Sequence, residues 1–390
     1  MRLYNKTLRE IWDDLPLPYR IVVVAGALFI VFTLIFLLFL TASGLGRAMN
    51  AGKGQLEINA ARAVGLLDPS MASDGKTISA LAYTSLEAQN GIRISLATTG
   101  FPCQRWRWNQ DIFEERRETL LAPDGTTTLS QGMTRYETPA LVYDPQDSAA
   151  PWKIFAYRYF WMGNADFAQR YSTIVMRTAP AVTGPWSKEE WILGTAPDYP
   201  PPPYQGLVRA HINPMSAQLS GITGYARPSV VEDRGVLLMS LAAFKGPADI
   251  ERIVLLASLD HGKRWVYAGT LLTRAQLAQI GAFTRISGAS LLKQGQAIYL
   301  AAVFGDAQTS ANGTYLFRIS DPAKAKLVSN DNGVPAPVLF IDRQSAAPTP
   351  QGGGYAAFDE SCPLGIVTSE YSGLLNNYRL FSTLVMPAGK

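Results

Sequence analysis

The feature that most limits the fold is a repeated pair of short β-type strands. Residues 63–85, AVGLLDPSMASDGKTISALAYTS, resemble residues 139–160, PALVYDPQDSAAPWKIFAYRYF. Each segment contains a strand, an Asp-Pro turn and a second, more apolar strand. Residues 228–244, 289–305 and, more weakly, 355–371 repeat the pattern. Such repetition is typical of arrays in which each unit covers its apolar face with the next unit.

A third strand follows each pair, and a fourth fits after the first four pairs, as in WVYAGTLLT at 265–273. The third strands cover 92–99, 172–179, 253–259, 314–320 and 378–386. Four strands per unit, repeated five times, predict an all-β, five-bladed β-propeller over residues 55–387. The chain ends before a fourth strand can complete the last unit. We expect GQLEIN at 54–59 to supply it, which leaves the ring without an open sheet edge.

The octapeptide SLDHGKRW at 258–265 lies at the turn between the third and fourth strands of the third unit. It matches the pattern S-x-D-x-G-x-x-W. The Asp carboxylate can accept backbone N–H bonds, the Gly permits a positive φ, and the Trp can pack between sheets. TGFPCQRW at 99–106 and TGPW at 183–186 are reduced versions at the equivalent turns. These turns lie on the rim of a propeller, so the motif indicates the fold and not the chemistry.

This motif resembles the Asp-box of sialidases, and the five-unit pattern resembles the five-bladed glycoside hydrolases of families 43, 32 and 68. The resemblance covers about residues 55–387 and concerns the fold. It implies that the innermost strands carry the reacting groups. Glycoside cleavage needs one carboxyl group to protonate the leaving oxygen and a second as nucleophile or base.

Aligning the units on the Asp-Pro turn predicts which residues face the channel. One level holds Ala61, Glu137, Ala226 and Ser287, and the next holds Arg62, Thr138, Arg227 and Gly288. Only Glu137 is acidic there, although Glu57 or Asp111 would enter in a different register. Family 43 enzymes have an Asp near the start of the first unit and a Glu near the start of the third. This chain has Ala61–Arg62 and Ala226–Arg227 there, so the alignment predicts a channel poor in carboxylates.

Four arginines at or near this channel, Arg62, Arg135, Arg227 and Arg285, are candidate ligands for an anion, because guanidinium groups pair with carboxylates and phosphates. The sialidase resemblance implies a triad of Arg62, Arg227 and Arg285 for a substrate carboxylate. It also implies Glu137 beside Tyr136 or Tyr225 as the nucleophile pair. The alternative is that the arginines pair with loop carboxylates or pack along aromatic side chains.

The chain has two cysteines and two histidines, without metal-ligand spacing, so neither a metal nor a cofactor is expected. Cys103 and Cys362 map to turns of the first and fifth units, which are neighbours if the ring closes. They are therefore a candidate disulfide in an oxidising compartment, the alternative being two free, buried thiols.

Residues Ile21–Leu40, IVVVAGALFIVFTLIFLLFL, contain no charge and are long enough for a helix to cross a bilayer. We expect a cytoplasmic tail at 1–20, a transmembrane helix at 21–42 and a linker at 43–54. Four basic residues precede the span and two follow it closely, which favours a cytoplasmic N-terminus and a periplasmic or extracellular propeller on a single-pass inner-membrane protein. A signal peptide cleaved near TAS at 41–43 is the alternative.

The net charge of +4 comes without a basic run, so no nucleic acid is expected as a partner. The anchor and the carboxylate-poor channel favour a non-catalytic scaffold or accessory subunit on the outer face of a membrane complex. The bilayer and other subunits would then be its partners, contacted through the helix and two loops, 156–167 and 187–224. The alternatives are an anchored glycoside hydrolase, of family 43 or sialidase type, and a module that binds anionic glycans.

Overall fold

The structure is a computed structural model. It describes residues 16–19, 24, 26, 29, 31, 54–59, 61, 63–87, 91–101, 103, 105–162, 171–246, 249–306, 313–342, 353–371 and 378–383. The chain divides into two units, Met1–Gly54 and Gln55–Lys390. The predicted span at 21–42 falls almost wholly outside the described residues. Within the part of the chain that is described, no helix has the length and apolar character needed to cross a membrane.

The second unit is built almost entirely of antiparallel strands, as the sequence predicts. The first sheet has the order β1-β5-β4-β3-β2. Its strands are β1 (Ile58–Asn59), β2 (Gly65–Ser73), β3 (Ile78–Leu86), β4 (Ile92–Gly100) and β5 (Trp106–Glu114). The second sheet has the order β11-β10-β9-β8-β7-β6. Its strands are β6 (Arg116–Leu121), β7 (Thr128–Tyr143), β8 (Trp152–Trp161), β9 (Thr173–Ala179), β10 (Glu190–Gly194) and β11 (Ala210–His211).

The third sheet joins two groups of strands through a single register pair, Ile250 with Ile286. The first group is β12 (Gly224–Asp233), β13 (Val236–Phe244), β14 (Ile250–Ser258) and β15 (Val266–Thr273). The second group is β16 (Arg285–Gln294), β17 (Ala297–Gly305), β18 (Gly313–Asp321), β19 (Lys326–Leu327) and β20 (Leu339–Asp342). The fourth sheet is β21 (Gly353–Ala357), β22 (Ile366–Tyr371) and β23 (Tyr378–Thr383).

The helices between strands are short: η1 (Tyr204–Leu207), η2 (Asn213–Met215), η3 (Ala217–Leu219), η4 (Arg274–Gln276), α4 (Leu277–Ile280) and η5 (Pro322–Lys324).

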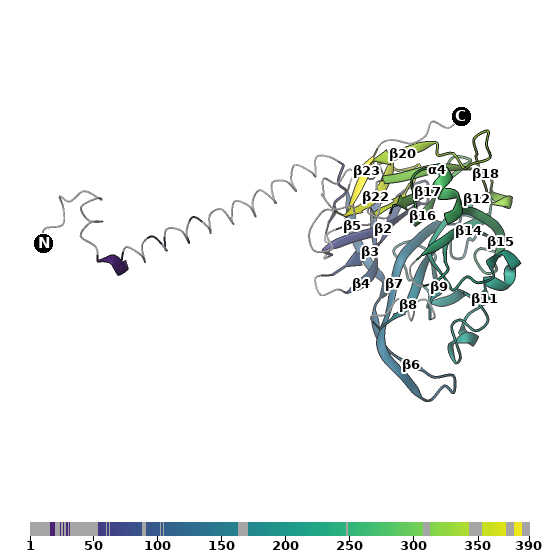
Figure 1. Cartoon of the computed structure of the whole chain (residues 1–390), viewed down its shortest axis with the longest axis horizontal. Coiled ribbons are helices and arrows are strands. Elements are labelled where there is room, and N and C mark those ends of the chain that lie inside the picture. The colour runs from purple at the N-terminus through teal and green to yellow at the C-terminus, as the bar shows by residue number, and fades with distance from the viewer. Residues whose placement is uncertain are drawn as a thin grey trace. The chain divides into compact units, whose positions relative to one another are not determined.

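These sheets form a propeller-like ring. The strands β2, β7, β12, β16 and β21 each contact the next, and β21 contacts β2. In Figure 1 the yellow strands β22 and β23 lie near the purple strand β2, which both of them contact. Apolar side chains fill the space between sheets, as Ile94 and Ile154 do between the first and second. Leu81 and Val367 belong to the core shared by the first and fourth sheets.

Backbone contacts and a disulfide join the two ends of the ring. Leu56 donates its backbone N–H to Leu380 at 2.8 Å, and Gln55 forms a bridge with Phe381. The predicted closing segment 54–59 therefore bonds to β23, but its last two residues, β1, pair with β5 of the first sheet. A disulfide also joins Cys103 and Cys362, whose Cα atoms are 5.6 Å apart. A crosslink between positions 259 residues apart in sequence restricts the unfolded chain strongly.

The octapeptide 258–265 forms the predicted Asp-box turn. Asp260 Oδ1 accepts hydrogen bonds from the Ser258 hydroxyl at 3.0 Å and the Arg264 backbone N–H at 2.8 Å. Gly262 has a φ of 86°, which favours glycine. The Trp265 indole is buried against the edge of Phe155, with ring centroids 5.8 Å apart, so it ties the third sheet to the second.

Two expectations about local structure were wrong. Asp68-Pro69 is not a turn between strands: it lies within β2, and the turn to β3 is at residues 74–77. Residues 156–161 are the end of strand β8 and not a loop, while 163–170 lie outside the described residues.

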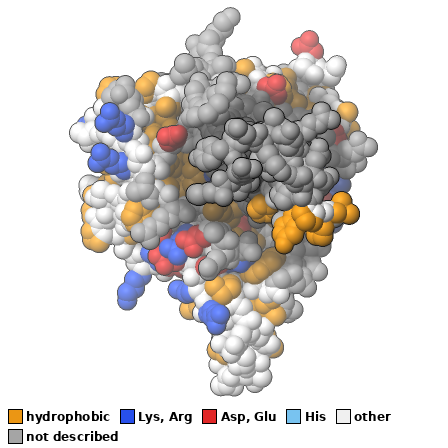
Figure 2. Space-filling view, turned by 90° about the vertical axis from the view of Figure 1, so that its left-hand side faces the viewer, with side chains coloured by type: hydrophobic (Ala, Val, Ile, Leu, Met, Phe, Trp, Pro, Cys, Tyr) orange, Lys and Arg blue, Asp and Glu red, His pale blue; other side chains and the backbone are white. Residues whose placement is uncertain are grey.

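On the face in Figure 2, acidic and basic side chains are interspersed, without a large patch of one sign among the described residues.

Candidate active site

The five ring strands bring polar side chains together at the centre of the second unit. Asp68 comes from β2, Glu137 from β7, Arg227 from β12, Ser287 from β16 and Tyr355 from β21. Asp68 interacts electrostatically with Glu137 and Arg227. The Arg227 guanidinium donates to the Ser287 backbone carbonyl and lies over the Tyr355 ring, 5.4 Å from its centroid.

A β-bulge at a similar place in each ring strand explains this convergence. The register of every ring strand shifts there relative to its hairpin partner. Asp68, Thr138 and Arg227 have φ values of 49°, 51° and 60°, and each precedes a proline. A bulge bends the strand and redirects its side chains. The three bulges therefore place Asp68, Arg227 and the neighbour of Thr138, Glu137, at the same end of the ring.

Asp68 is buried, with 9% of its surface exposed. The Thr84 hydroxyl donates to its Oδ2 at 2.9 Å. Burial, followed by the charge of Glu137, raises the pKa of Asp68 from 3.8 to about 6, against the opposing effects of Thr84 and Arg227. A carboxyl group with this pKa retains its proton in mildly acidic solution, as a general acid must.

Glu137 keeps part of its surface exposed and accepts a hydrogen bond from the Tyr159 hydroxyl. Tyr157 lies directly opposite Glu137 in the register and stacks on Tyr159, with centroids 5.0 Å apart. Burial, followed by the charge of Glu137, raises the pKa of both tyrosines. Tyr159 therefore remains a phenol and a hydrogen-bond donor to the Glu137 carboxylate.

Tyr355 packs closely against the backbone of β16. Its hydroxyl donates to the Ser287 carbonyl at 3.2 Å. A Cβ on Gly288 would lie 2.2 Å from that hydroxyl oxygen, so only glycine fits while Tyr355 holds this position. Tyr355 in turn supports the Arg227 guanidinium, since the face of an aromatic ring attracts a cation.

The structure separates the other predicted site residues from this centre. The Tyr136 hydroxyl is directed to Glu189 Oε2 at 2.7 Å, and its ring stacks on Phe113. The Tyr225 hydroxyl donates to Asn213 Oδ1 at 2.7 Å. Both tyrosines are buried in the core, and neither contacts Glu137 among the contacts that the described residues make. The tyrosine that does so is Tyr159.

Of the four predicted arginines, Arg227 is the one that the described residues place beside the two carboxylates. Arg135 forms an ion pair with Glu115 at 3.2 Å and lies over the Trp161 ring. Arg285 is exposed at the start of β16, and Arg62 lies outside the described residues. Arg135 follows the alternative expectation of pairing with a carboxylate and packing on an aromatic ring.

The sequence alignment missed Asp68, and the prediction of a carboxylate-poor channel was wrong for this reason. The alignment equated Asp68-Pro69 with Asp144-Pro145. Asp144 follows the end of β7, whereas Asp68 lies in the middle of β2. The signal that could have found it is the residue before proline in three of the five ring strands: Asp68 in β2, Thr138 in β7 and Arg227 in β12.

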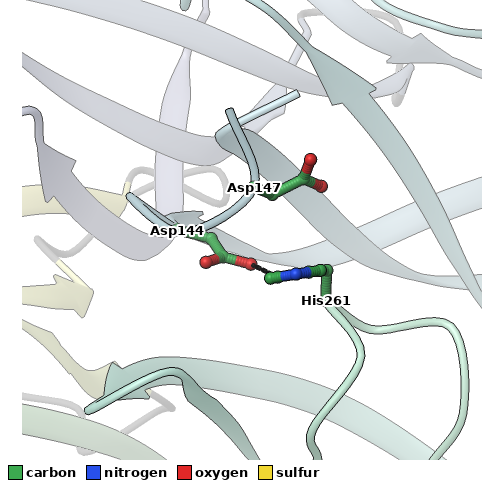
Figure 3. A group of neighbouring side chains, drawn as sticks. All are labelled: Asp144, Asp147 and His261. Atoms are coloured by element: carbon green, nitrogen blue, oxygen red, sulfur yellow. Dashed lines mark hydrogen bonds and ion pairs between the residues drawn. The ribbon is translucent and has the colours of Figure 1, made fainter. Parts of the chain in front are cut away.

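A second acidic cluster lies where the turn after β7 meets the Asp-box turn (Figure 3). Carboxylate and imidazole atoms of Asp144, Asp147 and His261 lie within 4.8 Å of one another. The His261 Nδ1 is 2.9 Å from Asp144 Oδ2. The Lys153 ammonium group is buried beside them, 2.7 Å from Asp147 and 3.3 Å from Asp144. Lys153 thus supplies the positive charge that a metal ion would bring, and the cluster is an ion network between two sheets.

Comparison with known proteins adds a likeness of fold. Neither a protein-family model nor a curated protein matches the sequence. Similar solved structures include the Hadza microbial sialidase Hz136, with 10% identity and a TM-score of 0.45, covering 83% of this chain and 57% of that one. An exo-β-1,3-galactanase from Clostridium thermocellum has 11% identity and a TM-score of 0.48, with coverage of 84% and 61%. An exo-β-1,3-galactanase from Phanerochaete chrysosporium has 13% identity and a TM-score of 0.47, covering 84% of this chain and 62% of that one. The chain spans less than two thirds of each of these proteins, and the likeness concerns the fold alone.

Proposed function

We propose that this protein is a five-bladed propeller that cleaves glycosides, with Asp68 and Glu137 as its two reacting carboxyl groups. The observation that carries this proposal is the meeting of two acidic side chains from neighbouring ring strands. The five-blade count is part of the proposal. It follows if the third sheet is divided at its single connecting pair, since each of the five resulting groups then holds one ring strand.

The environments of the two carboxyl groups suit different roles. Asp68 carries a proton into mildly acidic pH, so it can protonate the leaving oxygen of a glycoside. Glu137 is more accessible, and the Tyr159 hydroxyl orients it, so it can act as nucleophile or as the base that activates water. A pair of acidic groups whose surroundings separate their protonation behaviour is typical of acid–base catalysis.

Arg227 and Tyr355 complete the site from the other side. The Arg227 guanidinium retains donors beyond the one bonded to Ser287, and these can bind substrate hydroxyl or carboxylate oxygens. Among the described residues, Arg227 is the one arginine of the four candidates that lies beside the pair, which favours a glycosidase over a module built around an arginine ring. It supports no choice between neutral and acidic sugars.

The test is hydrolysis of 4-nitrophenyl glycosides, including β-galactoside, β-xyloside, α-L-arabinofuranoside and an α-sialoside. We expect Asp68→Asn and Glu137→Gln each to lower the rate about 10²–10⁴-fold. The surface variant Asp249→Asn, which removes an exposed carboxylate paired with Arg274, should keep the wild-type rate. The wild-type rate should decline above about pH 6, as Asp68 loses its proton.

Turnover that survives Glu137→Gln would overturn the proposal. Absence of turnover across the panel, with bound partner proteins after purification in mild detergent, would instead favour the non-catalytic scaffold. The segments 156–167 and 187–224 are its proposed contact surfaces.

We also propose that residues 21–42 anchor the protein in the inner membrane, with the propeller outside the cytoplasm. The support is the uncharged run of twenty residues, Ile21–Leu40. The full chain should sediment with membranes and require detergent for release, whereas a chain starting at residue 54 should not. Release of the full chain by salt alone would contradict an anchor.

A further inference from the structure

The first sheet carries a pocket of about 230 Å³ that is distinct from the Asp68–Glu137 site. Tyr83 lines it, whereas the neighbouring residue on β3, Thr84, faces Asp68. Adjacent residues of a strand point to opposite faces. The pocket therefore opens on the other face of the strand that supports the proposed general acid.

Strand register builds this pocket. Tyr83 on β3 lies directly opposite Ser95 on β4, and Ser95 lies opposite Asp111 on β5. Residues paired across strands share a face, so the three side chains form a row. Arg93 is two residues before Ser95 and thus lies on the same face.

A hydrogen-bond network holds the polar side chains in place. Arg93 pairs with Glu87 at 3.0 Å and with Asp111 at 3.1 Å. Asp111 Oδ1 accepts from the Ser95 hydroxyl at 2.7 Å and from the Trp108 indole N–H at 3.2 Å. The Trp108 ring is thereby oriented, although 41% of its surface is exposed. Small-molecule sites combine aromatic side chains with a few placed polar groups, and this pocket holds both, with a larger share of polar groups.

Tyr83 gives an independent indication of a ligand. Its side chain is completely buried, and no hydrogen bond of good geometry reaches its hydroxyl among the described residues, although the Ser95 hydroxyl, which donates to Asp111, lies near it. Buried hydroxyl groups nearly always have a partner, because leaving one unsatisfied destabilises the fold. A ligand hydroxyl in the pocket would supply the missing bond after a small shift of the exposed side chains above it.

We propose that this pocket binds a single neutral sugar ring, as a non-catalytic site separate from the Asp68–Glu137 pair. The volume is below the range of about 300–1,000 Å³ of drug-sized pockets, so the ligand is small. Arg93 pairs with both Glu87 and Asp111 and offsets one of their two charges, and the remaining negative charge disfavours an anion. Carboxylate oxygens and guanidinium N–H groups bind sugar hydroxyls, and the Trp108 face can pack on the C–H face of a ring.

The test is binding of methyl β-D-galactopyranoside, methyl β-D-glucopyranoside and methyl β-D-xylopyranoside to the full chain in detergent. Saturation-transfer NMR and tryptophan fluorescence give the affinity, with glucuronate and putrescine as the charged probes. We expect a neutral glycoside to bind, and Trp108→Ala and Tyr83→Phe each to weaken it about tenfold or more. Tyr83→Phe should leave the unfolding midpoint unchanged or raised. Phe101→Ala, which removes an exposed aromatic ring outside the pocket in the turn after β4, should bind normally.

Binding should persist in Glu137→Gln, which separates this site from the proposed catalytic one. Failure of all three glycosides to bind would overturn the proposal, as would affinity that Trp108→Ala and Tyr83→Phe leave unchanged. Preference for glucuronate or putrescine would also overturn it. Loss of stability in Tyr83→Phe would contradict it by assigning the hydroxyl a structural role. Hydrolysis in the nitrophenyl assay is independent of these outcomes.

Discussion

Two groups of acidic side chains in this protein have opposite electrostatics. Where the second and third sheets meet, Asp144 and Asp147 share the buried ammonium group of Lys153. Burial would raise the pKa of Asp147, but the hydrogen bond and charge of Lys153 hold it below its ordinary value. At the ring centre, burial and Glu137 raise the pKa of Asp68 to about 6. Neutralised carboxylates join sheets, whereas an incompletely neutralised pair retains a proton that can be transferred.

The largest expected effect is loss of the Lys153 charge. Lys153→Met should lower the free energy of unfolding by about 3–5 kcal/mol, because it leaves two carboxylates near each other without their cation. Denaturant unfolding measures the change. Lys263→Met, at an exposed position, is the control and should have little effect. A small effect of Lys153→Met would mean that the two clusters do not differ as described.

Asp68→Asn should stabilise the protein at neutral pH. The folded protein holds the Asp68 proton up to about pH 6, whereas an unfolded chain releases it near 3.8. The stabilisation that the protonated Asp68 contributes is therefore complete below pH 3.8 and is lost as the pH rises through about 6. The advantage of the variant should grow by about 2.4 kcal/mol between pH 4 and pH 7. An advantage independent of pH, as expected for the control Asp249→Asn, would contradict the raised pKa.

Gly288→Ala tests the packing that supports Arg227. The added Cβ would meet the Tyr355 hydroxyl at 2.2 Å, so the ring must move away from Arg227. We expect a loss of about 1–3 kcal/mol in unfolding free energy and, if the proposed activity holds, a lower rate. Gly206→Ala is the matched control, since no atom lies within 4 Å of its added Cβ. Equal effects of the two substitutions would show that Tyr355 does not depend on Gly288.

His261→Ala should have the smallest effect, about 1 kcal/mol or less, because the partly exposed imidazole adds to an Asp144 that Lys153 already neutralises. Thermal unfolding compares it with Lys153→Met. A loss equal to that of Lys153→Met would assign His261 the neutralising role.

Much of the fold was predictable because it depends on local patterns. Repeated strand pairs indicated the propeller-like ring, and the spacing of Ser258, Asp260, Gly262 and Trp265 identified a turn whose contacts the structure confirms. Closure of the ring also predicted that Cys103 and Cys362 lie close together, and the structure joins them in a disulfide.

The site was predictable only in part. The sequence alignment placed Glu137 and Arg227 at the channel but not Asp68. The dipeptide Asp-Pro occurs both at a bulge within β2 and in the turn after β7, so the alignment treated two different structures as equivalent. A bulge is a property of backbone pairing, and the letters of the sequence do not distinguish it from a turn. Tyr159 and the row of Tyr83, Ser95 and Asp111 depend on cross-strand register, which hydrophobic patterns determine only loosely.

The most direct test of the central claim is the titration of the Asp68 carboxyl group by ¹³C NMR, in the wild-type protein and in Glu137→Gln. We expect a pKa of about 6 in the wild type, falling in the variant as the facing charge is removed, while burial keeps it above 3.8. A wild-type value near 3.8, or one that Glu137→Gln leaves unchanged, would contradict the claim that the two carboxyl groups form one site.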